Sequence, residues 1–156
     1  MAGETSRVRY PNMNPEGTRL RTDIRSQGRY QAFRRALAQL QEPFVHNAED
    51  LSDLGKEGAV HRFKYTLELA WKTMKDFLEY GGAQIEPITP RNVIKEAFAA
   101  KVISNGDIWI EMLDFRNLLS HTYNSEVFDK AISAIENQYL PIFNGLNQWL
   151  SNQISE

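Results

Sequence analysis

Apolar residues recur every three or four positions along most of this chain, which is the spacing of one face of an α-helix. The clearest stretch is 57–80, and similar stretches cover 29–44, 108–119 and 125–150. No alternating pattern typical of β-strands competes with them. On 29–44 the predicted core stripe is Phe33, Leu37, Leu40 and Phe44. On 57–80 it is Val60, Phe63, Leu67, Ala70, Met74 and Phe77, and Trp71 and Leu78 widen it. On 125–150 it is Phe128, Ile132, Ile135, Leu140, Phe143, Leu146 and Leu150.

The stretch 108–119 carries two apolar rows. Ile108, Met112, Phe115 and Leu119 are the predicted core stripe, and Trp109 and Leu113 flank it.

Residues that stop or cap helices separate these stretches. Gly81-Gly82 predicts the end of the long second helix, and a proline at its first position predicts a short helix over 90–100. Asn124 or Ser125 can cap the last helix. Pro141 predicts a kink inside that helix, because proline lacks a backbone donor and clashes with the preceding turn.

The fold class that follows is all-α, an up-and-down four-helix bundle with one additional short helix. Trp71, Trp109 and Trp149 are hard to hide inside one small bundle. We therefore expect a homodimer that buries the surplus apolar surface.

The length of 156 residues suits one domain, and the composition is ordinary for a globular protein. The absence of cysteine excludes disulfides, thiolate metal sites and cysteine nucleophiles. No apolar run is long enough to span a membrane, and residues 1–14 lack the apolar core of a signal peptide. These features favour a cytoplasmic protein without a membrane partner.

The net charge of −2 conceals an asymmetry. Residues 1–35 hold eight arginines against three acids, a net of +5, whereas residues 36–156 hold ten bases against seventeen acids, a net of −7. Residues 1–27 are rich in Pro and Gly and poor in large apolar residues, so we interpret them as a basic arm with little core of its own. Such an arm either contacts RNA phosphates or lies on the acidic body.

Motifs for nucleotide-phosphate loops and for serine nucleophiles are absent. His46, His61 and His121 lie far apart and none has a neighbour at metal-ligand spacing, so no metal or bound cofactor is expected. We interpret His46 and His61 as surface residues. The segment 114–123 instead gathers an arginine, a histidine and a tyrosine at the end of an apolar helix, where cations also simply complement the helix dipole.

The spacing Arg116-x-x-x-x-His121-x-Tyr123 resembles the signature of the HEPN superfamily, in its HepT-like branch. Further segments, in the same order, resemble the helical nucleotidyltransferase substrate-binding proteins, and the likeness covers about 29–150. They are Arg29-Tyr30 through Leu40, Arg62-Phe63-Lys64-Tyr65, Glu68-Leu69-Ala70-Trp71-Lys72, Pro90-Arg91-Asn92-Val93-Ile94-Lys95-Glu96-Ala97-Phe98 and Tyr139-Leu140-Pro141.

The resemblance implies a HEPN-like bundle domain over 28–156, a homodimer, and the toxin of a toxin–antitoxin pair whose partner is a minimal nucleotidyltransferase. Such toxins are metal-independent ribonucleases, so RNA is the implied substrate. Arg116 and His121 would be catalytic and Asn117 supporting. Tyr123 would accept AMP units that the partner transfers from ATP to silence the toxin.

These residue types suit RNA cleavage without a metal. Histidine can take the 2′-hydroxyl proton near neutral pH, and arginine can stabilise the charge on the phosphorus centre. On a continuous helix, however, Arg116 and His121 would lie about 140° apart. Either the helix ends near Ser120 and the chain turns His121 back, or two chains share the site; we favour a helix end at a dimer interface.

Glu68 lies near the apolar stripe of the long helix, where it either holds Arg116 or pairs with Lys64 or Lys72 one turn away. Three functional hypotheses follow from the sequence. The first is the HepT-like ribonuclease toxin. The second is a non-catalytic subunit that presents substrate to a nucleotidyltransferase. The third is a structural dimer in which the arginine, histidine and tyrosine only stabilise the interface.

Overall fold

A long central helix, α3, organises the fold. The computed structural model describes residues 16–154, with side chains described over 27–153. In this part of the chain there are five helices and no strands, if the last three consecutive elements are counted as one helix. The elements are α2 (Glu16–Gln41), α3 (Asp53–Tyr80), α4 (Pro90–Ala99), α5 (Gly106–Leu119), α6 (Ser125–Ala134), a π-helical turn (Ile135–Tyr139) and α7 (Leu140–Ile154), with short 3-10 turns at Glu42–Phe44 and Ala48–Asp50.

Local signals set the ends of these helices. The Ser52 side chain accepts a hydrogen bond from the Gly55 N–H at 3.0 Å and caps α3, which ends where Gly81 and Gly82 follow. Gly82 has a φ of 103°, a conformation that glycine adopts without strain. Asn124 caps α6 by accepting from the Val127 N–H, so it is the predicted capping residue that acts.

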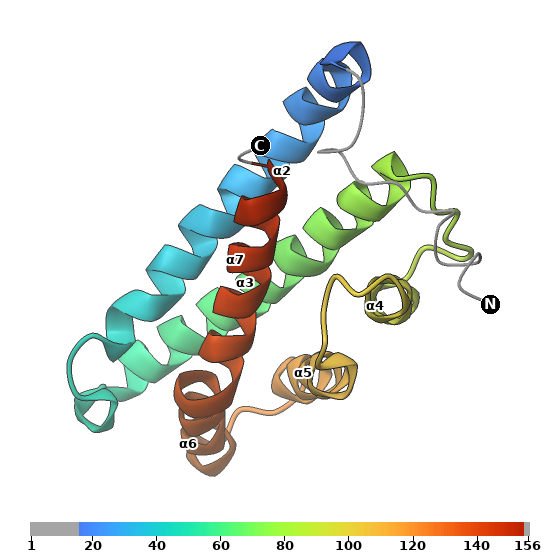
Figure 1. The fold of residues 1–156 in the computed structure, drawn as a ribbon. Helices are drawn as coiled ribbons and strands as arrows, with labels where there is room; N and C mark the ends of the chain where they lie inside the picture. The colour runs from blue at the N-terminus through green and yellow to red at the C-terminus, as the bar shows by residue number, and fades with distance from the viewer. Residues whose placement is uncertain (1–15, 155–156) are drawn as a thin grey trace.

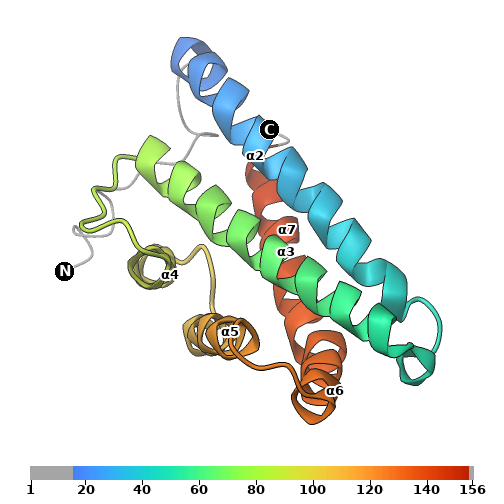
Figure 2. The same cartoon turned by 180° about the vertical axis from the view of Figure 1, so that it is seen from behind.

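Two directions of helix packing are visible in Figures 1 and 2. α2 and α3 lie side by side and antiparallel, and α7 returns along them. α4 and α5 are instead seen nearly end-on, so they lie across α3. The predicted all-α class is confirmed, whereas the up-and-down arrangement describes α2, α3 and the C-terminal helices better than it describes α4 and α5.

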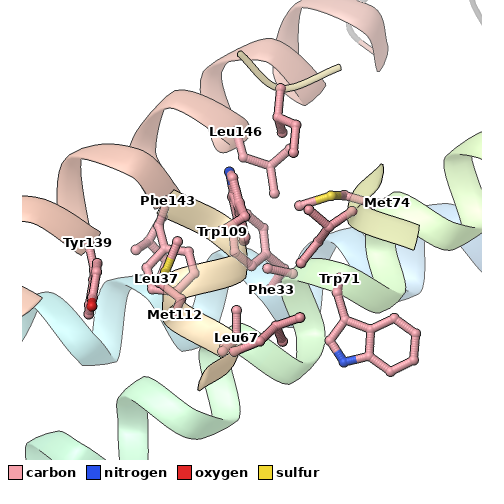
Figure 3. Close-up of a cluster of buried hydrophobic side chains, with 14 of the residues drawn as sticks. Phe33, Leu37, Leu67, Trp71, Met74, Trp109, Met112, Tyr139, Phe143 and Leu146 are labelled. Carbon is pink, nitrogen blue, oxygen red and sulfur yellow. The ribbon is translucent and has the colours of Figure 1, made fainter. Parts of the chain in front are cut away.

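The core lies between α3 and its neighbours (Figure 3). The predicted stripe of α3 is buried along its whole length, and Phe63, Leu67, Ala70 and Met74 are inaccessible to solvent. Trp109 sits at the centre, with its ring edge-to-face against Phe143 at 5.6 Å between centroids. Such packing of large apolar groups supplies most of the stability of a small domain.

The core-facing side of α5 includes residues of both apolar rows. Met112 and Leu119 of the predicted stripe are buried, and so are Trp109 and Leu113, which were expected at the flank. Ile108 and Phe115 of the predicted stripe are only partly buried. The two rows are about 100° apart, so the buried face lies between them.

The tryptophans do not require a dimer, contrary to our expectation. Within one chain Trp109 is 1% and Trp71 8% exposed, and Trp149 is partly buried against Phe77.

Pro141 lies just after a π-helical turn. The Leu140 N–H donates to the Ile135 carbonyl five residues back, so the helix is widened by one residue before the proline. Figure 1 shows the helix axis changing direction between α6 and α7. The predicted kink is therefore present, with its widened turn N-terminal to Pro141.

The predicted start of the first helix, at Arg29, is wrong, because α2 begins at Glu16. Residues 16–28 lack an apolar stripe, so the periodicity of apolar residues gave no sign of this part of the helix. Residues 1–15 of the predicted arm lie outside the described residues. Over the described residues, no helix is long and apolar enough to cross a membrane.

Removal of the Tyr139 hydroxyl should weaken the link between the π-helical turn and α5. Its ring stacks on Phe63 at 5.4 Å, and its hydroxyl donates to Glu111 Oε2 at 2.8 Å. We expect Tyr139→Phe to lower the free energy of unfolding by about 1 kcal/mol, since the ring stays and one hydrogen bond is lost. Urea unfolding measures this. A loss of about 4 kcal/mol, as for removal of a whole buried ring, would contradict it.

Candidate functional site

The last turn of α5 carries the polar residues of the predicted signature. α5 ends at Leu119, and the Ser120 and His121 N–H groups bond back to carbonyls of this turn. The Ser120 hydroxyl also donates to the Arg116 carbonyl at 3.0 Å. The helix end predicted near Ser120 is thus confirmed, and His121 stands in the turn that follows.

Glu68 on α3 holds Arg116 on α5. Arg116 Nη1 donates to Glu68 Oε1 at 3.3 Å, and Arg116 Nη2 donates to Asn117 Oδ1 at 3.2 Å. Lys72 Nζ binds the other carboxylate oxygen, Oε2, at 3.0 Å. The alternatives considered for Glu68 are therefore both realised, because one oxygen serves Arg116 and the other serves Lys72.

Trp71 adds a third donor to the same carboxylate. Its indole Nε1–H donates to Glu68 Oε1 at 3.2 Å, so this oxygen is shared between the indole and Arg116. Because the Trp71 ring is buried at the edge of the core (Figure 3), it fixes the carboxylate relative to the packed body. We name the group Glu68, Trp71, Lys72, Arg116 and Asn117 the Glu68 cluster.

The Glu68 cluster favours a charged carboxylate. Partial burial raises the pKa of Glu68, but hydrogen bonds from Lys72 and Trp71, and the charges of Lys72 and Arg116, outweigh it. The net result is a pKa of Glu68 below its ordinary value. Arg116 therefore faces a permanent anion at neutral pH, and its side chain keeps 23% exposure, so other donors of the guanidinium can reach a ligand.

His121 and Tyr123 lie beyond the helix end and are exposed. No side-chain hydrogen bond joins His121 to Arg116 among the described residues. Tyr123 is 80% exposed, with its ring 6.3 Å from that of Phe128. A single chain thus brings Glu68, Arg116 and Asn117 together, but it does not bring His121 or Tyr123 into the Glu68 cluster.

Tyr123 lines a separate shallow pocket of about 160 Å³ at the start of α3. Lys56 and Glu57, which also line it, precede Glu68 by twelve and eleven residues. At about 1.5 Å per residue, the pocket lies roughly 17 Å from Glu68 along the helix. Tyr123 is therefore accessible to an external enzyme and distant from Arg116 of its own chain.

Sequence reasoning missed two parts of this region. Trp71 was assigned only to the core, although its position three residues after Glu68 places its indole within reach of that carboxylate. Arg91 of α4 pairs with Asp114 of α5 at 2.6 Å, a contact between helices that no local spacing signals. Within the described residues, no group of three or more His, Asp or Glu side chains is arranged to hold a metal ion.

Comparison with known proteins identifies the family of this chain. Residues 28–152 match the sequence model described as "Nucleotidyltransferase substrate binding protein like". The chain belongs to this nucleotidyltransferase substrate-binding, HEPN-like family, and the resemblance inferred from the sequence is confirmed.

Two relatives give further context. The chain is 31% identical over 72 residues to a protein of Haemophilus influenzae named "Probable ribonuclease HepT", and the match covers 44% of this chain and 49% of that protein. It thus spans about half the length of that relative. A crystal structure of a protein from Thermus thermophilus superposes with a TM-score of 0.65 at 27% identity, covering 78% of this chain and 98% of the other.

The ion pairs of Glu68 should make stability depend on pH in a defined direction. Because the folded-state pKa of Glu68 is depressed, its contribution is present above the ordinary value of 4.5 and is lost as pH falls through the folded value. We expect the free energy of unfolding of wild type to exceed that of Glu68→Gln by about 1 kcal/mol at pH 7, a modest value because the ion pairs are partly exposed. At pH 3 the difference should be smaller. Urea unfolding at both pH values measures this.

Glu57→Gln is the matched control, because Glu57 lies on the same helix and is exposed. The free energy of unfolding of Glu57→Gln should stay close to that of wild type at pH 7. An equal penalty for Glu68→Gln at both pH values would contradict a role for the charged carboxylate.

Proposed function

We propose that this protein is a metal-independent endoribonuclease, the HepT-like toxin of a pair whose antitoxin is a minimal nucleotidyltransferase. The observation that carries the proposal is Arg116, held in place by Glu68 yet open to a ligand, five residues before an exposed histidine. The name of the Haemophilus influenzae relative supports the ribonuclease activity, and the family name supports the partner. A cytoplasmic location would bring such a protein to its RNA.

The reaction proposed is an internal transfer at phosphorus. His121 removes the 2′-hydroxyl proton of the nucleotide, and the 2′-oxygen forms a bond to the adjacent phosphorus. The bond from phosphorus to the 5′-oxygen of the next nucleotide breaks, and that oxygen takes up a proton. Arg116 stabilises the negative charge that builds up on the phosphate oxygens, since its planar donors match them.

The protonation of the leaving oxygen is the reason for proposing a homodimer. A single histidine cannot be base and acid at the same moment, whereas two chains would supply two histidines. Leu118, in the last turn of α5, is 47% exposed, and it borders a shallow groove with Phe115 and Tyr139. An apolar surface beside the signature residues favours contact between two copies there.

Replacement of the proposed base should abolish cleavage while leaving the fold intact. We expect purified wild type to cleave RNA in EDTA, and His121→Ala to be slower by at least about a hundredfold, the usual minimum contribution of a general base. Gel analysis of a labelled RNA measures the rates. His46→Ala, which changes an exposed loop histidine, should cleave like wild type. Equal cleavage by His121→Ala would refute the proposed chemistry.

The proposed silencing reaction should act on Tyr123. The phenol is well exposed in a shallow pocket, which suits attack on the α-phosphate of ATP with release of pyrophosphate. With ATP and the cognate nucleotidyltransferase, intact-mass analysis should show AMP additions that disappear in Tyr123→Phe. Tyr65→Phe is the matched control, because Tyr65 is also an exposed tyrosine. Additions that map to another residue would exclude the role given to Tyr123.

The second candidate function is a non-catalytic subunit that binds substrate for a nucleotidyltransferase. The family description favours it directly. It predicts a stable complex with the partner and no RNA cleavage by the purified chain. The cleavage assay above therefore separates the two functions.

A further inference from the structure

The solvent face of α3 carries a row of side chains beside the Glu68 cluster. Leu54, His61, Tyr65, Glu68 and Lys72 recur at spacings of three, four and seven residues, and all are exposed or partly exposed. Tyr65 is the large aromatic residue of this row and is 53% exposed. At about 100° per residue it points opposite Met74, which is fully buried.

Tyr65 lies one helical turn before Glu68. The two residues are about 60° apart around the helix and about 4.5 Å apart along it, so their side chains are neighbours on the surface. Because Glu68 binds Arg116 at 3.3 Å, Tyr65 lies one helical turn from the carboxylate that holds the guanidinium. Among the described residues, no hydrogen bond involves the Tyr65 hydroxyl, and no other aromatic ring packs against the Tyr65 ring.

The charge around Tyr65 is opposite in sign to that of the body. Residues 61–75 hold four bases and one acid, whereas residues 36–156 have a net charge of −7. Three of the four bases are paired: Arg62 with Glu42, Lys72 with Glu68 and Lys75 with Asp76. Lys64, next to Tyr65, has no ion pair within the described part of the chain. This segment therefore offers an unpaired lysine next to an open aromatic ring, and cations and aromatic rings are the groups that bind single-stranded nucleic acids.

We propose that Tyr65 is a base-stacking platform for single-stranded RNA, which seats a nucleotide next to the phosphate held by Arg116. Stacking uses the face of the ring, so it accepts any base and gives affinity rather than sequence specificity. Lys64 binds a flanking phosphate. The proposal rests on the ribonuclease function above and adds a substrate subsite to it.

Two other aromatic side chains near the signature do not suit this role. Trp71 is buried, and its indole N–H is used by Glu68. Tyr123 is exposed but lies beside Phe128 near the start of α3, away from Arg116 of the same chain. Tyr65 alone among these three combines exposure with a position one helical turn from Glu68.

The test measures binding of a short single-stranded RNA whose riboses carry 2′-O-methyl groups, so that the full-length protein cannot cleave it by 2′-oxygen attack. Fluorescence anisotropy gives the affinity at several salt concentrations for wild type, Tyr65→Ala, Tyr65→Phe and Lys64→Ala. Leu54→Ala is the control, because Leu54 is exposed on the same face, eleven residues before Tyr65. Circular dichroism and light scattering report the fold and the oligomeric state of each variant.

We expect Tyr65→Ala to bind about tenfold more weakly, whereas Tyr65→Phe and Leu54→Ala bind like wild type. The salt dependence should be unchanged in Tyr65→Ala, since no charge is lost. For Lys64→Ala, the slope of log affinity against log salt should be smaller by about 0.7, the value for one phosphate contact on a single strand.

Wild-type affinity in Tyr65→Ala would overturn the proposal, as would an equal loss in Tyr65→Phe. A change of oligomeric mass in Tyr65→Ala with unchanged RNA affinity would also overturn it and would identify this face as a protein interface. Binding of the methylated RNA that depends on Tyr65, without cleavage of ordinary RNA, would refute the ribonuclease function but retain the subsite. If Tyr65→Ala cleaves limiting ordinary RNA at the wild-type rate, the subsite is refuted and the ribonuclease function is retained.

Discussion

The packing of α3 is the constraint on which the rest of this structure depends. One side of the helix is completely buried, and α2, α4, α5 and α6 all pack against it. The other side stays open to solvent and carries Tyr65, Glu68 and Lys72. Because both sides belong to one rigid element, the core that stabilises the domain also fixes the position of the polar residues.

Glu68 transmits this rigidity to the candidate site. The buried indole of Trp71 and the ammonium of Lys72 restrain its carboxylate, which in turn holds Arg116 at the end of α5. A lone surface arginine would sample many rotamers before it met a phosphate, whereas a tethered one has lost that freedom already. Glu68 is therefore a positioning residue in this account, and Arg116 is the residue that would touch the substrate.

Much of the fold could be predicted from the sequence, because the stripes of α3 and of the last helix have a single apolar face. Prediction was incomplete for α5, where both apolar rows contribute buried residues, and wrong for the start of α2, which has no stripe. The Arg116–Glu68 contact was foreseen as one of two alternatives, and the structure contains both. The separation of Tyr123 from Arg116 could not be predicted, because the path of the chain after Leu119 depends on contacts between residues distant in sequence.

The chemistry assigned to Arg116 and His121 is tested most directly by the ends of the RNA fragments. Wild-type protein would be incubated with a defined single-stranded RNA in EDTA, and the products analysed by mass spectrometry. Attack by the 2′-oxygen predicts fragments that end in a 2′,3′-cyclic phosphate and fragments that begin with a 5′-hydroxyl. Fragments with a 3′-hydroxyl and a 5′-phosphate, or the absence of any cleavage, would contradict the account.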